Sequence, residues 1–259
     1  MPVRNRLIQL LADNRGAQAR RFEIVAKDNE AEVFLYDAIV DDELMAEWWG
    51  GVAPESFVKA LRALDVSTIH LRVNSPGGSV FAARAIEQAL RDHKARVVAH
   101  VDGFAASAAS FIIMAADEIV MGKGAMIMIH KAWTIAFGNA DDMGATKDLL
   151  DKLDGTLVQT YADRTGQSPK QITDWMAAET WFTAAEAVDN GFADRVAEDA
   201  PKDGASAQAA WNLSAYLAAP KPAAAADPAP TPEPAHATQD HRSRQQQRVR
   251  AMQLAHPIA

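Results

Sequence analysis

The sequence predicts one α/β domain whose central sheet is mostly parallel. Between residues 67 and 130, short apolar runs typical of strands alternate with amphipathic helical segments. This alternation is typical of parallel strands joined by right-handed crossovers. The chain has 259 residues, 49% of them hydrophobic, so one sizeable core can form. After about residue 198 alanine and proline dominate, so we expect the packed domain to end there.

The first half of the domain is expected to alternate strands and helices. Residues 22–40 alternate apolar and polar side chains around the turn-like KDNE, which predicts two strands. Pro54 favours the first turn of a helix, and the residues after it place apolar side chains on one face. The same periodicities predict, in order, a strand at 67–75, a helix at 80–93, a strand at 95–103, a helix after Ser107 and a short buried strand at 125–130.

The second half is expected to be mostly helical. A long helix at 141–164 carries an apolar stripe that ends at Tyr161. Two capping boxes predict the starts of two further helices, at Ser168 with Gln171 and at Thr183 with Glu186. Asn190-Gly191 is expected to end the second of these helices, and residues 192–196 predict a last strand.

Three regions follow from these patterns. Residues 1–21 are rich in arginine and are expected to form an arm outside the core. Residues 22–198 are the expected domain. Residues 199–259 combine an Ala/Pro-rich linker with a basic tail, which cannot bury enough apolar surface to fold. We expect this extension to be largely disordered, although 207–219 has the composition of a short helix.

The composition excludes several classes of function. A formal net charge of −8 argues against a nucleic-acid partner. The chain has no cysteine, which excludes disulfides, thiolate metal sites and a cysteine nucleophile. No apolar stretch approaches the roughly 20 residues that a membrane span needs, and the apolar run near the start is too short for a secretory signal. We therefore expect a cytoplasmic protein without a membrane partner.

Two turns at predicted strand ends have unusual sequences. In NSPGGS, Gly77 and Gly78 allow positive φ angles, so backbone N–H groups can point at an anion. In GFAAS, Ser107 lies at the start of a helix, where free N–H groups favour negative charge. Each pattern alone is more often structural, a tight turn in the first case and a helix cap in the second.

A serine nucleophile needs a base at neutral pH. Of the seven histidines, His130 directly follows the buried strand AMIMI. Because functional groups in open α/β sheets gather where strands end, this histidine can lie near Ser107. A strand-end histidine without a role is about equally compatible with the sequence at this point.

Together these motifs resemble the proteolytic subunit of Clp protease, ClpP. NSPGGSV, GFAAS, MIH, TGQS and WFTAAEAVDNGFAD occur in that order and spacing, within residues 33–196. The resemblance implies a ClpP/crotonase-type spiral of ββα units and a serine endopeptidase without cofactor or metal. It implies these roles: nucleophile Ser107, general base His130, and oxyanion donors at Gly77 or Gly78 and at Ala108. Ser110, outside the motif, is expected to serve packing.

The third member of the family's triad is missing. The family has an aspartate where this chain has Thr180. A threonine hydroxyl can accept a hydrogen bond from imidazole, but it carries no charge to stabilise imidazolium. Glu179 and Asp174 are nearby carboxylates, the first expected to point away and the second to lie on a helix. We expect Thr180 to orient His130 and turnover to be slow or dependent on assembly.

The resemblance also implies partners. The segment ETWFTAAEAV and the extension past the core resemble ClpP-related proteases of phage head maturation, which implies a capsid or scaffold protein as substrate. The family forms rings, so we expect a homo-oligomer, a heptamer with its rings stacked through the helix at 141–164. An ATP-driven AAA+ unfoldase is a further implied partner.

Four alternatives remain open. The chain can be a proteolytic subunit that works with an unfoldase in general protein degradation. It can be a crotonase-type enzyme that acts on acyl-CoA with a backbone oxyanion hole. It can use a Ser-Lys dyad, with Lys123 or Lys131 as the base. The missing aspartate also fits a structural or scaffolding homologue with weak catalysis.

Overall fold

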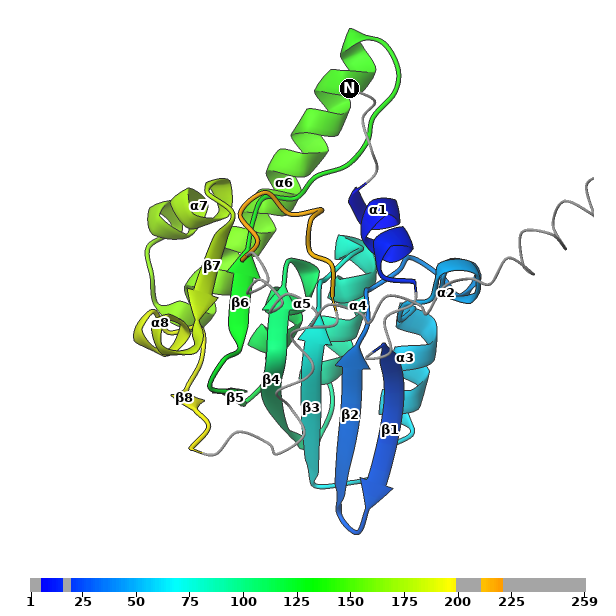
Figure 1. Ribbon diagram of the computed structural model, residues 1–259, viewed down its shortest axis with the longest axis vertical. Coiled ribbons are helices and arrows are strands. Elements are labelled where there is room, and N and C mark those ends of the chain that lie inside the picture. Colours follow the sequence, from blue (N-terminus) through cyan, green and yellow to red (C-terminus); the bar gives the residue numbers. More distant parts are fainter. Residues whose placement is uncertain (1–5, 16–19, 199–210, 221–259) are drawn as a thin grey trace, which may run out of the picture. The chain divides into compact units, whose positions relative to one another are not determined.

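A single twisted sheet organises the folded part of the chain (Figure 1). The computed structural model describes residues 6–15, 20–198 and 211–220, all within the unit Met1–Pro220. Within these residues the sheet has eight strands: β1 Arg21–Lys27, β2 Glu30–Tyr36, β3 Thr68–Ser75, β4 Arg96–Ala106, β5 Glu118–Met121, β6 Met126–Ile129, β7 Thr180–Thr183 and β8 Arg195–Val196.

The strands are mostly parallel. The main path runs β1-β2-β3-β4-β5-β8, and β6 pairs with both β4 and β7. Only the β1–β2 hairpin and the β6–β7 pair are antiparallel among the described strands. The carboxyl ends of β2, β3, β4 and β6 therefore meet at one edge, the upper edge in Figure 1.

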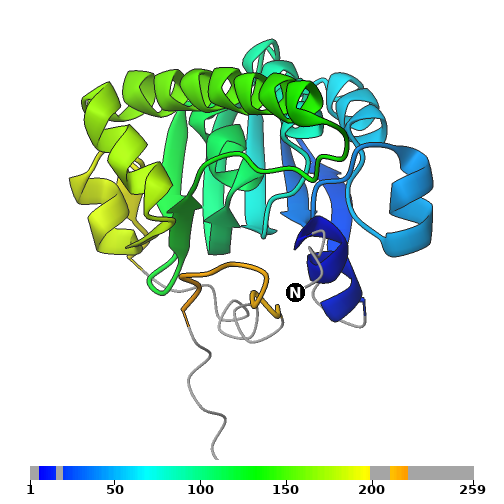
Figure 2. The ribbon, with the colours of Figure 1, turned by 90° about the horizontal axis from the view of Figure 1, so that it is seen from above.

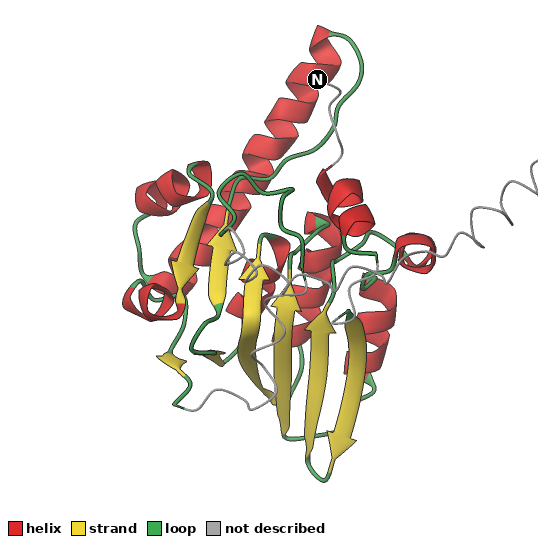
Figure 3. Ribbon diagram, viewed as in Figure 1, coloured by secondary structure: helices red, strands yellow, loops and turns green. Residues whose placement is uncertain are grey.

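Helices cover one face of this sheet, and strands and helices alternate along the chain (Figures 2 and 3). The described helices are α1 Arg6–Asp13, α2 Glu43–Trp49, α3 Pro54–Arg62, α4 Val80–Arg91, α5 Ala108–Ile112, the 3₁₀ turn η1 Ile113–Ala115, α6 Ala140–Thr165, α7 Pro169–Ala177 and α8 Ala184–Asp189. α3, α4, α5 and α6 lie on the covered face, whereas α1 and residues 211–220 lie toward the opposite face (Figure 2). None of these helices is long and apolar enough to cross a bilayer.

The core lies between the sheet and its covering helices. Phe57 and Leu61 of α3, and Ile86 of α4, are fully buried against strand residues such as Leu71. These apolar positions recur at helical spacing, so each helix presents one apolar face to the sheet. In α6 only Leu157 and Tyr161 are fully buried, and the first turns of the helix project beyond the sheet (Figure 1). Most of the expected stripe on α6 is therefore exposed or half-buried in this chain.

Most predicted elements are confirmed, and the exceptions are short. The structure contains the predicted strands at 22–40, 67–75, 95–103 and 125–130, the helices opened by Pro54, Ser168 and Thr183, and the long helix. The helices α1 and α2 and the strand β5 were not predicted. The helix after Ser107 ends at once in η1, because Ala116 adopts an extended conformation and β5 then pairs with β4.

The structure corrects two expectations about the ends. Residues 1–21 were expected outside the core, but Leu10 and Leu11 of α1 are buried against the domain. A short helix was suggested at 207–219, but residues 211–220 form turns that are packed on the domain. Residues 199–210 and 221–259 lie outside the described residues.

Candidate active site

Ser107 and His130 meet at the carboxyl edge of the sheet. Ser107 directly follows β4 and His130 directly follows β6. β4 and β6 are parallel, with Ala106 opposite Met128, so the two strands deliver their next residues to the same place. Ser107 Oγ and His130 Nε2 lie 2.7 Å apart, within hydrogen-bond distance.

The backbone at Ser107 makes a sharp turn. Its φ of 53° and ψ of −124° lie in a region that non-glycine residues rarely occupy. Its N–H donates to the carbonyl of Met128 at 2.9 Å, which fixes the turn against β6. Such a conformation costs about 1–3 kcal/mol and is found where surrounding contacts impose it. The turn from strand to helix presents the hydroxyl of Ser107 to His130.

The two glycines form the neighbouring wall. The Ile39 N–H donates to the Gly77 carbonyl at 2.8 Å, and the Ser79 N–H donates to the Ile39 carbonyl at 2.9 Å. In this bridge the N–H of Gly78 points away from Ile39, and Gly78 lines the same small cavity as Ser107. Among the described groups, no acceptor is bonded to this N–H.

Gly77 also leaves room beside Ala108. Gly77 has a φ of +85°, and a Cβ on it would lie 2.7 Å from the Ala108 nitrogen and 2.8 Å from Ser107 Cβ. A side chain at this position would cover the Ala108 N–H. As the first residue of α5, Ala108 has no acceptor for its N–H within the helix. Gly77, Gly78 and Ala108 thus surround the space next to Ser107.

Thr180 lies beside the site without a hydrogen bond to His130 among the described contacts. It pairs with Ile129, the residue before His130, in the antiparallel β6–β7 ladder. Its hydroxyl donates to the carbonyl of Trp175 at 2.8 Å. That bond uses the single hydroxyl proton, so the oxygen keeps lone pairs with which it can accept from imidazole.

The two nearby carboxylates have other partners. Glu179 is 8% exposed, has a φ of 51°, and accepts a hydrogen bond from the Ala218 N–H at 2.6 Å. Asp174 forms an exposed ion pair with Lys170. The hydroxyl of Ser107 pairs with His130, and the lysines of the Ser-Lys alternative, Lys123 and Lys131, are both exposed.

Residues 211–220 cover the site, which the sequence did not predict. The Tyr216 ring packs edge-on against His130, with centroids 5.6 Å apart at 87°. Its hydroxyl donates to the Pro76 carbonyl. The cavity that remains over Ser107 measures about 10 Å³, room for about one water molecule, and is lined by Leu7, Leu10, Gly78, Trp133, Ala215 and Tyr216. A larger cavity of about 520 Å³ lies around the start of β4 and includes neither Ser107 nor His130 in its lining.

This arrangement has the parts that acyl transfer needs. It has a hydroxyl nucleophile, an imidazole base within reach, and two backbone N–H groups beside the nucleophile that can hold an oxyanion. Among the described residues, no group of three or more His, Asp or Glu side chains is placed to hold a metal ion.

Comparisons with known proteins agree on one family. The family model described as Clp protease matches residues 6–200. ATP-dependent Clp protease proteolytic subunit 2 of Rhodococcus jostii is 32% identical over 145 residues, which cover 54% of this chain and 73% of that protein. The proteolytic subunit of Streptococcus agalactiae is 28% identical over 201 residues, covering 74% of this chain and 98% of that protein.

The fold agrees with the sequence match. A solved structure of a ClpP1 mutant from Listeria monocytogenes superposes with a TM-score of 0.56 at 24% identity, and the match covers 67% of this chain and 93% of that one. This likeness confirms the predicted fold, an α/β spiral of the ClpP type with parallel strands. From the match over residues 6–200 and this shared fold, we conclude that the chain belongs to the Clp protease family.

Proposed function

We propose that the chain is a serine endopeptidase that cleaves peptide bonds through an acyl-enzyme on Ser107. The observation that carries this proposal is the 2.7 Å separation of Ser107 Oγ and His130 Nε2 beside the N–H groups of Ala108 and Gly78. Family membership supports it, because the matched relatives are named as proteolytic subunits. The protease domain in this proposal is the part within residues 22–198.

The steps follow from this geometry. His130 Nε2 takes the hydroxyl proton while Ser107 Oγ attacks the peptide carbonyl carbon. The carbonyl oxygen becomes an oxyanion, to which Ala108 and Gly78 donate. The N–H of Gly77, the other predicted donor, is already bonded to Ser75 Oγ at 3.2 Å. Losing one such donor typically costs about 100- to 1000-fold in rate. The imidazolium then protonates the leaving amine. In the second half of the reaction, His130 takes a proton from water as the water attacks the acyl-enzyme, and then returns a proton to Ser107 Oγ.

Thr180 is the proposed third member. Its oxygen lies on the strand next to His130 and can accept a hydrogen bond from the imidazole N–H. A neutral hydroxyl stabilises imidazolium less than a carboxylate does, so we expect slower turnover than a complete Ser-His-Asp triad provides.

The test is covalent labelling of the full chain with a fluorophosphonate probe, followed by mass spectrometry of the modified peptide. We expect labelling at Ser107, abolished in Ser107→Ala and strongly reduced in His130→Ala. His93→Ala is the matched control, because that imidazole accepts a bond from the Ala95 N–H in a connection at the other end of β4. A wild type that is not labelled at Ser107 would contradict the proposal and favour a structural homologue or a crotonase-type enzyme.

The assembly and the natural substrate are finer proposals. The matched relatives are named as subunits of an ATP-dependent protease, so we propose a ring oligomer, a heptamer, in the cytoplasm, and an AAA+ unfoldase as an alternative partner. Mass photometry of the full chain tests the ring, and monomers at micromolar concentration would contradict it.

The sequence pattern ETWFTAAEAV and the Ala/Pro-rich extension favour head maturation, with a capsid or scaffold protein as substrate. Co-expression of the wild type or Ser107→Ala with capsid and scaffold proteins encoded beside this chain tests this role. We expect fragments that require Ser107. Intact capsid and scaffold proteins beside an active enzyme would favour general degradation instead.

A further inference from the structure

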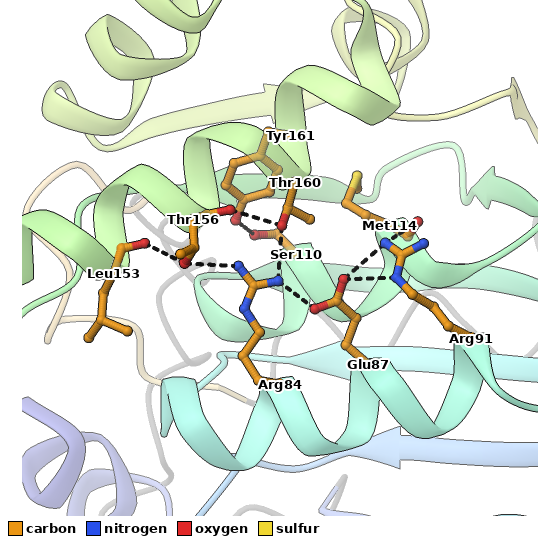
Figure 4. Close-up of polar contacts among 9 residues, drawn as sticks. All are labelled: Arg84, Glu87, Arg91, Ser110, Met114, Leu153, Thr156, Thr160 and Tyr161. Carbon is orange, nitrogen blue, oxygen red and sulfur yellow. Dashed lines mark hydrogen bonds and ion pairs between the residues drawn. The ribbon is translucent and has the colours of Figure 1, made fainter.

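Ser110, three residues after Ser107, meets Tyr161 of α6 (Figure 4). Ser110 is fully buried, and its N–H and its hydroxyl both donate to the Ser107 carbonyl, at 2.9 and 2.5 Å. The Tyr161 hydroxyl lies 2.7 Å from Ser110 Oγ. Because Ser110 directs its single hydroxyl proton to Ser107, Tyr161 is the donor in the second bond.

The carbonyl held in this way shares a peptide unit with the proposed oxyanion donor. A trans peptide is planar, so the oxygen of Ser107 and the N–H of Ala108 point in opposite directions. Fixing the oxygen toward Ser110 therefore aims the N–H at the opposite side. On that side lies Gly77, whose missing Cβ would have been 2.7 Å from the Ala108 nitrogen.

Tyr161 is itself held firmly. It is 1% exposed, and its ring packs edge-on against Phe192. Figure 4 shows Arg84 reaching from α4 to Thr160 and Thr156 of α6. These bonds, of 2.9 and 3.3 Å, fix the part of α6 that carries Tyr161. Burial raises the pKa of the Tyr161 hydroxyl, so it stays protonated and remains a donor.

From these contacts we infer that Ser110 and Tyr161 are positioning residues for the oxyanion donor at Ala108. This inference rests on the proposed function. Ser107 has strained φ and ψ angles. Without the bond from the Ser110 hydroxyl, which Tyr161 holds in place, the peptide that follows Ser107 can relax by rotation. The Ala108 N–H then leaves the position in which it meets the oxyanion, while the Ser107 and His130 side chains stay in place.

The test measures Ser107-dependent hydrolysis of p-nitrophenyl acetate by the full chain. In Ser110→Ala and Tyr161→Phe we expect kcat to fall about tenfold or more, part of the loss typical of an oxyanion donor, with KM unchanged. Ser110→Thr, which keeps a hydroxyl, is expected to retain most of the rate. The double variant Ser110→Ala/Tyr161→Phe removes both hydroxyls, so neither is left buried without a partner. A low kcat at an unfolding temperature near that of the wild type then identifies lost positioning, not lost stability.

Tyr36→Phe is the matched control, because it removes another partly buried tyrosine hydroxyl, one that bonds Asp102 on the sheet. It is expected to leave kcat unchanged. If the wild type hydrolyses the ester through Ser107 and Tyr161→Phe keeps the full kcat, the positioning role is wrong and the proposed function stands. If hydrolysis by the wild type does not depend on Ser107, the proposed function fails first.

A second inference comes from different contacts, those of residues 211–220. Tyr216 packs on His130, donates to the Pro76 carbonyl, and lines the cavity over Ser107. Asn212 anchors one end of the segment through reciprocal bonds with Asn14, at 2.9 and 2.6 Å. The Ala218 N–H anchors the other end on Glu179 at 2.6 Å.

This position excludes a peptide. The proposed reaction requires a carbonyl carbon in contact with Ser107 Oγ, but the cavity there has room for about one water molecule. The segment also buries the indole N–H groups of Trp181 and Trp211, which have no acceptor among the described residues. Unsatisfied buried donors weaken such packing, so the segment can be displaced.

We propose that residues 211–220 are an intramolecular cover that must leave before a substrate reaches Ser107. This second inference also rests on the proposed function. Reactivity then scales with the fraction of molecules in which the cover is open. A change that loosens the cover without touching Ser107 or His130 must therefore raise the reaction rate.

The test compares the rate of fluorophosphonate labelling at Ser107 in full-length Tyr216→Ala and wild type. We expect Tyr216→Ala to react at least about tenfold faster, because it removes the contacts that close the site. Leu217→Ala is the matched control, since this neighbour is 83% exposed, and it should react like the wild type. Ala218→Pro, which removes the N–H donated to Glu179, should accelerate labelling as well.

Two outcomes overturn the cover. If Tyr216→Ala and wild type react equally fast at Ser107, the segment does not limit access. If Tyr216→Ala reacts more slowly, the segment belongs to the substrate site. Loss of the proposed function looks different, because then neither protein is labelled at Ser107.

Discussion

The backbone N–H of Ser107 donates to the carbonyl of Met128 across the junction of β4 and β6. This bond continues the parallel ladder that pairs Ala106 with Met128, two residues before His130. The distance between the serine and histidine side chains is therefore set by strand pairing. Ser107 is one residue after Ala106, and His130 is two residues after Met128. A shift of register by one residue would separate them.

Thr180→Val tests the proposed third member. The change keeps the shape of the side chain and removes the hydroxyl that bonds Trp175 and is proposed to orient His130. We expect kcat for p-nitrophenyl acetate to fall about 5- to 10-fold, the value of one neutral hydrogen bond. Thr173→Val, which breaks a similar threonine bond to the Pro169 carbonyl on α7, is the matched control. Equal kcat values for the two variants would remove Thr180 from the mechanism.

Gly77→Ala is expected to abolish activity. Its methyl group would lie 2.5 Å from the Ala106 carbonyl and 2.7 Å from the Ala108 nitrogen, at a φ of +85°. It therefore both strains the turn and covers the proposed oxyanion donor. We expect a loss of about 100-fold or more in kcat.

Gly155→Ala is the opposite case and serves as the control. Gly155 lies within α6 with nothing within 4 Å of an added Cβ. Alanine there should raise the free energy of unfolding by about 0.5–1 kcal/mol, because it favours the helix, and should leave kcat unchanged. Urea denaturation and ester hydrolysis of both variants provide the check. A fully active Gly77→Ala would rule out the proposed oxyanion site.

Glu87→Ala is expected to destabilise the fold. The side chain of Glu87 is 7% exposed and lies between Arg84 and Arg91, at 2.5 and 2.9 Å (Figure 4). Removing the buried carboxylate leaves two arginines without their partner, so we expect a loss of about 2–3 kcal/mol in urea denaturation. Asp151→Ala breaks an exposed pair with Lys147 and should leave the free energy of unfolding nearly unchanged. Similar losses in both variants would show that burial does not set the strength of the pair.

Much of this fold could be predicted from local patterns. The strands were visible as apolar runs and the helices as periodic faces with caps, and Thr183 with Glu186 forms the predicted capping box. β5 was not visible, because its four residues continue an apolar stretch whose period does not separate helix from strand. Only the pairing of β5 with β4 and β8, which are both long-range contacts, decides between helix and strand.

The candidate site was predicted less evenly. Short motifs pointed to Ser107, His130 and the Gly77–Gly78 turn, because each follows a strand. Ser110 was expected only to pack. Its bond to the Ser107 carbonyl is local, but its bond with Tyr161 depends on α6, about fifty residues later. Tyr216 follows a stretch of low sequence complexity, and nothing in its local sequence indicates a contact with His130. Contacts of this kind need the tertiary structure.

The pair His70 and His100 predicts a pH dependence of stability. Their ring nitrogens lie 3.0 Å apart on adjacent strands. Burial, helped by the charge of Arg72, lowers the pKa of His100 from its ordinary value of 6.5 to about 4. Above pH 6.5 His100 is neutral in the folded and unfolded states alike. Between pH 6.5 and 4 the unfolded state takes up a proton that the folded state does not, so stability falls as the pH falls through this window.

Urea denaturation between pH 7 and 4.5 measures this effect. Because the ring is only partly buried and solvent screens its charge, we expect His100 to account for a loss of about 1–2 kcal/mol across the window. His100→Gln removes the proton uptake, so its free energy of unfolding should fall less steeply with acid than that of the wild type. His93→Gln, at the partly exposed connection before β4, is the control and should follow the wild-type curve. Parallel curves for wild type and His100→Gln would mean that His100 titrates alike in both states.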